Sequence, residues 1–321
     1  MTEGAPLTND TARLVPRTSF TGPTLPFEFP GLEIGVAEYD EGPTGCTVFD
    51  FGAGAAAATD IRGGSPGTIG NYDYVHAICL AGGSIYGLEA ATGVSAELLA
   101  RGGHVVGWTD VKVVSGAIIF DFGPRTNSIY PDKELGRAAL RAARPGVFPL
   151  GARGAGRSAS VGKTFGHAHA EAGGQGGAYR RVGPTRVAVF TVVNAVGAIV
   201  DREGRVVRGH LDRGTGERSP LVAGVERRLA AAESPLPPPG NTTLTVVVTN
   251  QRLERRPLTA LARQVHASMA RAIQPFHALV DGDVLYAVTT NEVDNAALDS
   301  IGLGVAASEL AWDAVLSAVA D

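Results

Sequence analysis

The chain has few of the features that mark secreted, membrane-spanning or nucleic-acid-binding proteins. Among its 321 residues only Cys46 and Cys79 are cysteines, which excludes a disulfide framework and leads us to expect the cytoplasm. A net charge of −4 provides no basic surface for nucleic acid or for an anionic membrane. No apolar run reaches the length of a membrane span, and Glu3 and Asp10 stand where a secretory signal would be basic and then apolar.

Charge is also sparse, at 19% of residues, while apolar residues make up 44%, which is typical of a globular chain. The length allows one large domain or two ordinary ones. Residues 1–30 are polar and contain prolines, so we expect an arm there. What the chain has in excess is glycine, with 43 residues and no collagen period, which predicts many tight turns and closely packed layers.

Hydrophobic periodicity predicts four helices and several strands. The helical segments are Tyr86–Arg101, Asp132–Ala143, Leu258–Ala272 and Gly304–Val319. The strand-like segments are Leu32–Glu38, Cys46–Phe51, Val105–Val106, Val187–Val193, Ala198–Val200, Leu244–Thr249 and Val284–Thr290. Residues 205–240 are rich in Arg, Gly and Pro and indicate an irregular linker. Because strands and helices come in groups, we expect an α+β fold with sheet packed on sheet and helices outside.

A proline-rich stretch at residues 235–239 runs into Gly240, Asn241 and Thr242, where a β-forming run of Thr and Val begins. Proline excludes regular structure from the stretch, whereas Thr and Val favour a packed strand. One interpretation is a loop followed by a buried strand. The other is a chain that cuts itself before Thr242 and uses the new N-terminus as a nucleophile. The segment alone favours the first interpretation.

The nucleotide-binding motifs in the middle of the chain are incomplete. Gly162-Lys163-Thr164 resembles the end of a phosphate-binding loop, but Arg157 stands where that loop needs glycine. The glycine-rich residues 164–177 also lack the helical period that should follow. Lys163 therefore needs another explanation, and a solvated loop lysine is the simplest one on these residues.

Other candidate groups are ambiguous or unsupported. His167 and His169 have no carboxylate or cysteine at ligand spacing, so no metal site is expected. Cys79 lies in an apolar run and predicts a buried thiol, and Ser84 lacks the Gly-x-Ser-x-Gly elbow of a hydrolase triad. The segment 281–283, Asp-Gly-Asp, is either a turn leading into a strand or a carboxylate pair that orients an ammonium group or relays a proton.

Several longer segments together resemble one family. They are Glu41–Gly45, NYDYVHAICLAGGSIYGLEAATGVSAELL from Asn71, YPDKELGRAAL from Tyr130, SASVGK from Ser158, GNTTLTVVVTN from Gly240, QVHASMARAIQPFH from Gln264 and DGDVLYAVTT from Asp281. They are similar to the self-processing D-aminopeptidases and β-aminopeptidases, and within that family most similar to the 6-aminohexanoate-oligomer endohydrolases, or nylon oligomer hydrolases. The likeness implies a four-layer αββα catalytic domain over residues 28–321, behind a flexible arm of residues 1–27.

The resemblance also implies cleavage between Asn241 and Thr242 into residues 1–241 and 242–321, which stay associated and assemble further, commonly into a tetramer. It makes Thr242 the nucleophile and its freed α-amino group the general base. This assignment suits the chemistry, because an α-amine titrates at roughly pKa 7.7–8.0 while a hydroxyl alone is a poor nucleophile at neutral pH.

The other site residues follow from the same resemblance. Lys163 matches the family's active-site lysine, whose charge would keep the Thr242 amine unprotonated. Asn194 matches the residue whose side-chain amide faces the oxyanion. Asp281 and Asp283 match the carboxylates behind the nucleophile, which orient its amine and pass protons. The resemblance implies no cofactor and no metal ion.

One position departs from the family pattern. Nylon hydrolases carry a tyrosine whose hydroxyl enters the site, but this chain has Phe120, which leaves Tyr130 or a water to replace the hydroxyl. The sequence thus predicts an autoproteolytic amidohydrolase that cleaves small linear amides, with 6-aminohexanoate oligomers as the best match. Two alternatives remain: an aminopeptidase or esterase acting on β-amino or D-amino acid peptides, amides and esters, and an unprocessed, non-catalytic binding protein of the same fold.

Overall fold

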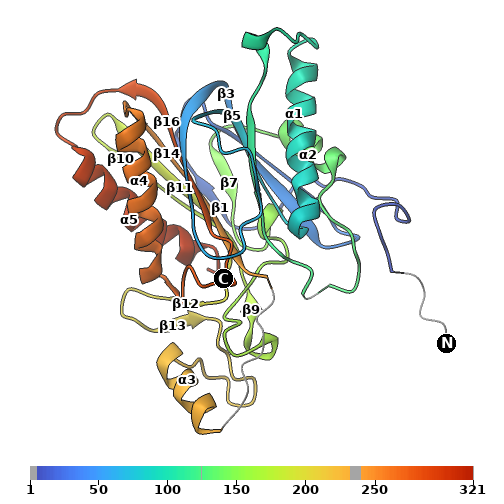
Figure 1. Ribbon diagram of the computed structural model, residues 1–321, viewed down its shortest axis with the longest axis vertical. Coiled ribbons are helices and arrows are strands. Elements are labelled where there is room, and N and C mark those ends of the chain that lie inside the picture. Colours follow the sequence, from blue (N-terminus) through green and yellow to red (C-terminus); the bar gives the residue numbers. More distant parts are fainter. Residues whose placement is uncertain (1–5, 124, 232–239, 321) are drawn as a thin grey trace.

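The computed structural model describes residues 6–123, 125–231 and 240–320 (Figure 1), so the proline stretch at 235–239 lies outside the described residues. The helices are α1 Glu89–Arg101, α2 Lys133–Arg141, α3 Leu221–Ala230, α4 Arg255–Ser268 and α5 Ser300–Ser317. The strands are β1 Thr24–Pro26, β2 Glu33–Tyr39, β3 Thr44–Ile61, β4 Thr68–Ile69, β5 Tyr74–Ala81, β6 Val114–Ile118, β7 Val147–Pro149, β8 Ser160–Val161, β9 Glu171–Ala172, β10 Gly174–Val182, β11 Thr185–Asn194, β12 Ala198–Val200, β13 Val206–Arg208, β14 Thr242–Gln251, β15 Ile273–Gln274 and β16 Val284–Val293.

The long strand β3 belongs to two sheet layers. Its first part pairs with β2 and its last part pairs with β16, while β5 runs beside it. The pairing with β5 changes register between Asp50 and Ala55, where Gly52 and Gly54 have φ values of 54° and 93°. Glycine adopts such conformations without steric cost, so these residues let β3 turn from one layer into the other. The hydrogen-bonded order is β10-β11-β14-β16-β3-β5-β6-β4, with β2 added at β3.

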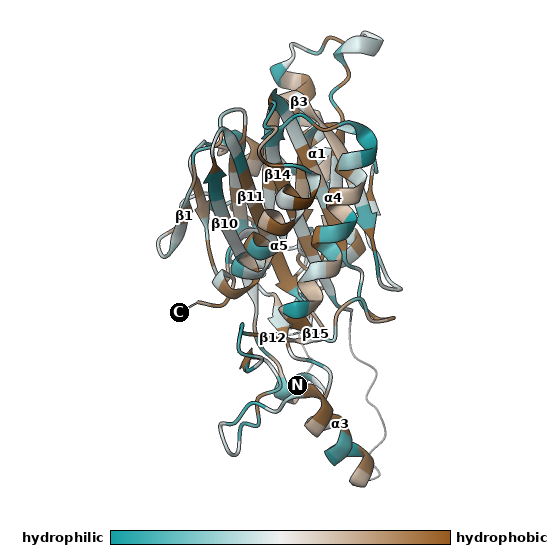
Figure 2. Cartoon of the chain, turned by 90° about the vertical axis from the view of Figure 1, so that its left-hand side faces the viewer, coloured by the Kyte–Doolittle hydropathy of each residue, from teal (hydrophilic) through white to brown (hydrophobic). Residues whose placement is uncertain are grey.

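Three hydrophobic clusters separate four layers. Along β14, Val246 and Val248 face the cluster between the sheet layers, whereas Val247 faces α4 and α5. Along β5, Ile78 faces the same central cluster, whereas Cys79 faces α1 and α2. Figure 1 shows the two helix pairs on opposite sides of the sheets, and Figure 2 shows hydrophobic residues along β11 and β14 behind α4 and α5. The predicted α+β, four-layer αββα sandwich is confirmed.

Phenylalanines from distant parts of the sequence anchor the central cluster. Phe190 on β11 contacts Phe148, Phe49 and Phe27, with ring centroids 4.9, 5.3 and 5.5 Å apart. Full burial of such a side chain contributes roughly 1.5–3 kcal/mol to folding. Because Phe27 takes part, the end of the N-terminal segment is held in the core of the molecule.

The predicted helices are confirmed as α1, α2, α4 and α5, with ends shifted by a few residues. A strand at Val105–Val106 is wrong, because these residues form an exposed connection after α1. The linker predicted over residues 205–240 is wrong in part, because its Arg-rich composition concealed β13 and α3. Within the described residues, no helix combines the length and apolar character needed to cross a membrane.

The glycine-rich strand β10 was not predicted, because it lacks the β-branched residues that mark a strand. Its glycines serve close packing against α5. A Cβ on Gly176 would lie 2.0 Å from the carbonyl oxygen of Ala314, and one on Gly174 would lie 2.6 Å from that of Ala318. These contacts involve backbone atoms, so α5 rests directly on the backbone of β10.

Substituting Gly176 by alanine is expected to destabilise the fold. The added Cβ forces α5 away from β10, and overpacking of this kind costs typically 1–3 kcal/mol of unfolding free energy. The measurement is the urea denaturation midpoint of Gly176→Ala against wild type. Gly102→Ala is the control, because its Cβ meets nothing closer than 3.4 Å. Equal midpoints for the two variants would contradict the account of β10.

Candidate active site

The ends of three neighbouring strands meet at the predicted cleavage site. Thr242 is the first residue of β14, and its cross-strand partner is Asn194, the last residue of β11. On its other side β14 runs parallel to β16, and Asn241 forms a bridge with Asp281 before β16. The structure thus brings every predicted site residue into one buried group, with exposed fractions of 3% for Thr242, 2% for Lys163, 1% for Asn194 and Asn241, and 0% for Asp281 and Asp283.

Two donors hold the carbonyl oxygen of Asn241. The hydroxyl of Thr242 donates to it at 2.5 Å, and the backbone N–H of Gly282 donates to it at 2.9 Å. Gly282 lies so close to the neighbouring loop that a Cβ there would be 2.3 Å from the carbonyl oxygen of Ser65. The hydroxyl is thus adjacent to the carbonyl group of the preceding residue, and the N–H of Gly282 is a donor to the same oxygen.

Lys163 and Asn194 form one hydrogen-bonded unit. Lys163 Nζ donates to Asn194 O at 3.0 Å and to Asn194 Oδ1 at 3.2 Å, and Oδ1 also accepts from the N–H of Ser160 at 2.9 Å. Burial lowers the pKa of Lys163 to about 7, and the negative charge of Asp281 opposes part of this shift. The alternative of a solvated loop lysine is therefore wrong, and Lys163 exchanges its proton near neutral pH.

The side chain of Asn194 also has a role as donor. Its Nδ2 donates to the carbonyl oxygen of Phe120 at 3.0 Å. A primary amide has two N–H groups, so one remains for a further acceptor. The Lys163 and Ser160 contacts on Oδ1 fix which way the amide points.

The two carboxylates behind Thr242 accept hydrogen bonds from different loops. Asp281 accepts from the N–H of Ala278 at 2.9 Å and of Val196 at 3.3 Å. Burial and the adjacent charge of Asp283 raise the pKa of Asp281 to about 7. Asp283 Oδ1 accepts from the N–H of Thr243 at 2.7 Å. The segment 281–283 leads directly into β16, so it is both a connection into a strand and a buried carboxylate pair.

Two groups at this site were not predicted. The N–H of Gly282 is a backbone donor, which residue type does not reveal. The ring Nδ1 of His277 lies 2.9 Å from Asp283 Oδ2. Its only signal was its place in the segment 264–277, which contributed to the resemblance.

Phe120 lies against Gly240, the residue before Asn241. A Cβ on Gly240 would lie 2.8 Å from the Cβ of Phe120. From there an aromatic row runs through Phe122 and Tyr86 to Tyr130, with ring centroids 5.7, 6.5 and 5.8 Å apart. Tyr130 stands at the far end of the row with its hydroxyl toward Glu89. It therefore does not replace the hydroxyl that Phe120 lacks.

Two clefts border these residues. One, of about 440 Å³, is lined by Ser160, Ser158, His167 and Arg213, among others. The other, of about 470 Å³, is lined by Tyr86, Phe122 and Tyr130 together with residues 8–10. Because Ser160 holds Asn194 and Phe122 contacts Phe120, each cleft adjoins a residue of the site.

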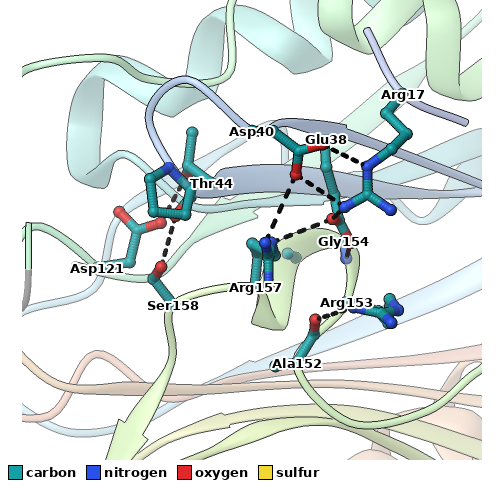
Figure 3. Close-up of polar contacts among 12 residues, drawn as sticks. Arg17, Glu38, Asp40, Thr44, Asp121, Ala152, Arg153, Gly154, Arg157 and Ser158 are labelled. Atoms are coloured by element: carbon teal, nitrogen blue, oxygen red, sulfur yellow. Dashed lines mark hydrogen bonds and ion pairs between the residues drawn. The ribbon is translucent and has the colours of Figure 1, made fainter. Parts of the chain in front are cut away.

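Polar contacts join the segment that contains Ser158 and the segment that contains Asp121 to one loop (Figure 3). The Ser158 hydroxyl donates to the carbonyl oxygen of Pro43 at 2.5 Å, and the next residue, Thr44, donates to Asp121 Oδ2 at 2.6 Å. Nearby, Arg157 Nε lies 3.2 Å from the fully buried Glu38 carboxylate. The segment that holds Asn194 and the segment that contains Phe120 are thus tied to the same loop.

The remaining sequence motifs are structural or lie at the periphery. Gly154–Gly156 is a short 3₁₀ helix, and Cys79 is buried against α1 and α2, as predicted for a structural thiol. His169 Nδ1 lies 2.9 Å from the carbonyl oxygen of Leu211. Over the part of the chain that the structure describes, no three His, Cys, Asp or Glu residues group as metal ligands.

Comparisons with known proteins identify the family and the fold of this chain. A 6-aminohexanoate-oligomer endohydrolase of Paenarthrobacter ureafaciens is 49% identical over 320 residues, which cover 97% of this chain and 90% of the relative. Among solved structures, a Burkholderia sp. beta-aminopeptidase has a TM-score of 0.64 and 18% identity, over 92% of this chain and 88% of its own. The L-aminopeptidase D-Ala-esterase/amidase of Ochrobactrum anthropi, described as a variant of the Ntn hydrolase fold, has a TM-score of 0.66 and 17% identity, over 94% and 88%.

At these identities the two solved structures establish the fold. The sequence pattern of peptidase family S58 matches residues 28–321, nearly the whole chain. Together with the 49% identity to the oligomer endohydrolase, this match means that the protein is an amide-bond hydrolase and belongs to peptidase family S58.

Proposed function

We propose that the chain matures by cutting its own Asn241–Thr242 bond and then acts as an N-terminal-threonine amidohydrolase on linear amides. One observation carries the proposal. The Thr242 hydroxyl lies 2.5 Å from the Asn241 carbonyl oxygen, which the Gly282 N–H also holds at 2.9 Å. The substrate class comes from the 49% identity to a 6-aminohexanoate-oligomer endohydrolase, so oligomers of that type are the best-matched substrate.

Self-cleavage proceeds by an N-to-O acyl shift. Thr242 Oγ1 attacks the Asn241 carbonyl carbon, a C–O bond forms, and the C–N bond to Thr242 breaks as the nitrogen takes a proton. The Gly282 N–H stabilises the charge that develops on the carbonyl oxygen. Water then hydrolyses the ester, which frees the Asn241 carboxylate, the Thr242 hydroxyl and the α-amino group. The hydroxyl proton needs an acceptor, and Lys163 and Asp281 both exchange protons near pH 7.

The same hydroxyl then attacks the amide carbonyl of a substrate, and the Thr242 amine accepts its proton. The second N–H of the Asn194 amide is available to the oxyanion, a contact that is typically worth about 2.7–4 kcal/mol of transition-state stabilisation. The substrate amine departs with the proton, and water releases the acyl group. We assign Asp281 and Asp283, on the family resemblance, the roles of orienting the amine and passing protons.

The sheet order supports a lasting association of the two pieces. Residues 242–321 contribute β14 and β16, which lie between β11 and β3 of residues 1–241. The second piece is therefore hydrogen-bonded to the first on both sides. On the family resemblance we also propose that such pairs assemble into a tetramer, which native mass spectrometry measures directly.

Thr242→Ala is expected to abolish both processing and hydrolysis, because it removes the only atom assigned to attack. Thr242→Ser keeps a hydroxyl and should be cut. Thr243→Ala is the matched control and should also be cut, because Thr243 Oγ1 has no hydrogen-bond partner among the described residues. Intact mass decides the outcome. A wild-type chain that persists as one 33.0 kDa species without amidase activity would overturn the proposal.

Processing should accelerate as pH rises through about 7. Below that pH Asp281, whose pKa is raised to about 7, and Lys163, whose pKa is lowered to about 7, both hold a proton, so neither accepts one from Thr242. The rate should rise up to about tenfold per unit and then level off. Freshly translated precursor, sampled on gels between roughly pH 5.5 and 8.5, gives the rates.

Two variants identify the base in this experiment. If Lys163→Met flattens the profile and Asp281→Asn keeps it, Lys163 accepts the proton, and the converse result assigns Asp281. A wild-type rate that is constant across the range would contradict both assignments.

Phe120→Tyr is expected to raise kcat/KM on a 6-aminohexanoate oligomer by about two- to tenfold, the value of one hydrogen bond of roughly 0.5–1.5 kcal/mol. The control is Phe122→Tyr, which adds the same hydroxyl to the next ring of the row. An equal response of both variants would show that a hydroxyl at residue 120 has no specific role.

The same assay separates the proposed endohydrolase from an aminopeptidase. The wild-type enzyme is offered an oligomer with a blocked amino terminus and a dipeptide amide with a free one. An aminopeptidase needs the free terminus, so cleavage of the blocked oligomer supports endohydrolase activity. Cleavage of only the free-amine substrate would assign the aminopeptidase function instead.

A further inference from the structure

The carboxylate of Asp283 is held from two sides. Its Oδ1 accepts from the backbone N–H of Thr243, the residue after the nucleophile, at 2.7 Å. Its Oδ2 accepts from the ring Nδ1 of His277 at 2.9 Å and from the backbone N–H of His277 at 3.2 Å. Because a carboxylate oxygen accepts hydrogen bonds, the His277 ring donates from Nδ1, and the carboxylate has three N–H donors. His277 therefore fixes the group that aligns the first peptide bond after Thr242.

His277 is itself held by a second histidine. The His266 ring, on α4, meets the His277 ring edge-on, with centroids 4.4 Å apart and planes at 82°. His266 is fully buried, and its Nδ1 lies 2.9 Å from Asp60 Oδ2 on β3. Burial lowers the pKa of His266 against the pull of Asp60, so the ring is neutral and donates Nδ1–H to that carboxylate. Arg62 Nε anchors the same Asp60 oxygen at 2.7 Å.

The backbone at His277 is also unusual. Its φ is +61°, a left-handed conformation that costs free energy for most side chains and is tolerated by glycine and asparagine. This conformation turns both the backbone N–H and the ring Nδ1 of one residue toward one carboxylate oxygen.

We propose that His277 is a positioning residue for the reaction of Thr242, and that the row Asp283–His277–His266–Asp60 holds Asp283 as the charged member of the carboxylate pair so that Asp281 is the member that carries the proton. The proposal rests on the function proposed above. It assigns different roles to Asp281 and Asp283, which the sequence does not distinguish because they stand on either side of the same glycine. The Asp281 side chain accepts from backbone N–H groups, whereas Asp283 also has an imidazole donor.

The row provides Asp283 with a side-chain donor that Asp281 lacks. Two carboxylates so close together do not readily ionise at once, and the one with the better donors keeps the charge. The titratable and charged side chains of the surrounding elements are Asp281 in the same loop, Lys163 beside Asn194, His277 in the preceding loop, His266 on α4, and Asp60 and Arg62 at the end of β3.

The test compares His277→Gly with His277→Asn. Both residues tolerate the left-handed backbone, but only asparagine keeps a side-chain N–H donor near the position of Nδ1. Loss of this charge-assisted bond should lower the processing rate and kcat in His277→Gly by about 10- to 100-fold, with KM changed less than about twofold. The acidic limb of its kcat profile should also move to higher pH. His277→Asn should recover most of the rate and return the limb toward wild type.

Each outcome has a separate meaning. Thermal melting and intact mass first establish that both variants fold and how far each is cut. If wild-type protein is neither cut nor active, the proposed function fails before this inference is tested. If wild type is active and His277→Gly matches it in kcat and pH profile, His277 has no positioning role. An equal loss in both variants with an unmoved pH limb would assign His277 a structural role instead, which overturns the proposal.

Discussion

The structure depends on one constraint, that Thr242 opens a strand held on both edges. The β11–β14 ladder runs without a register shift from Val187 opposite Thr249 to Asn194 opposite Thr242. On the other edge the first paired residues of β14 and β16 are Leu244 and Val284. A nucleophile at this place is aligned by the backbone of two neighbours, and a cut before it interrupts neither ladder. In the proposed mechanism, the N-terminus made by the cut therefore inherits its position from the sheet.

Burial of the charged groups gives the site its chemistry. Lys163 and Asp281 are almost fully buried, and removing a charge from water is costly unless it is paired or neutralised. Both pKa values accordingly move to about 7, one downward and the other upward. The same burial that costs folding free energy makes these groups exchange protons at neutral pH. A lysine and an aspartate exposed to water would not cost this folding free energy, and they would not exchange protons near neutral pH.

The sequence predicted the parts of this molecule that depend on side-chain patterning. A run of Thr and Val predicted β14, and three- and four-residue spacing predicted α4 and α5. Features that depend on glycine and on the backbone were not predicted. The glycines of β10 allow α5 to pack against its backbone, but they do not mark a strand in the sequence. Gly282 contributes its backbone N–H, which its residue type does not reveal. Long-range partners were also beyond a single sequence, since Asp60 and His266 are 206 residues apart. The site residues were identified by the family resemblance. Without that resemblance, the residues around Lys163 indicated a solvated loop lysine.

In the mechanism proposed here, the intact Asn241–Thr242 bond is held in a state that favours its own cleavage. The side-chain amide of Asn241 is buried, and within the described residues neither its Nδ2 nor its Oδ1 has a hydrogen-bond partner. An unsatisfied buried polar group costs roughly 1–3 kcal/mol. The surrounding sheet maintains this cost as long as the chain is continuous, because Thr242 is fixed in β14. On that proposal, the cut frees Asn241 to leave and be solvated, and its departure clears the space beside Thr242 for a substrate. Relief of the buried amide and opening of the site are therefore the same event.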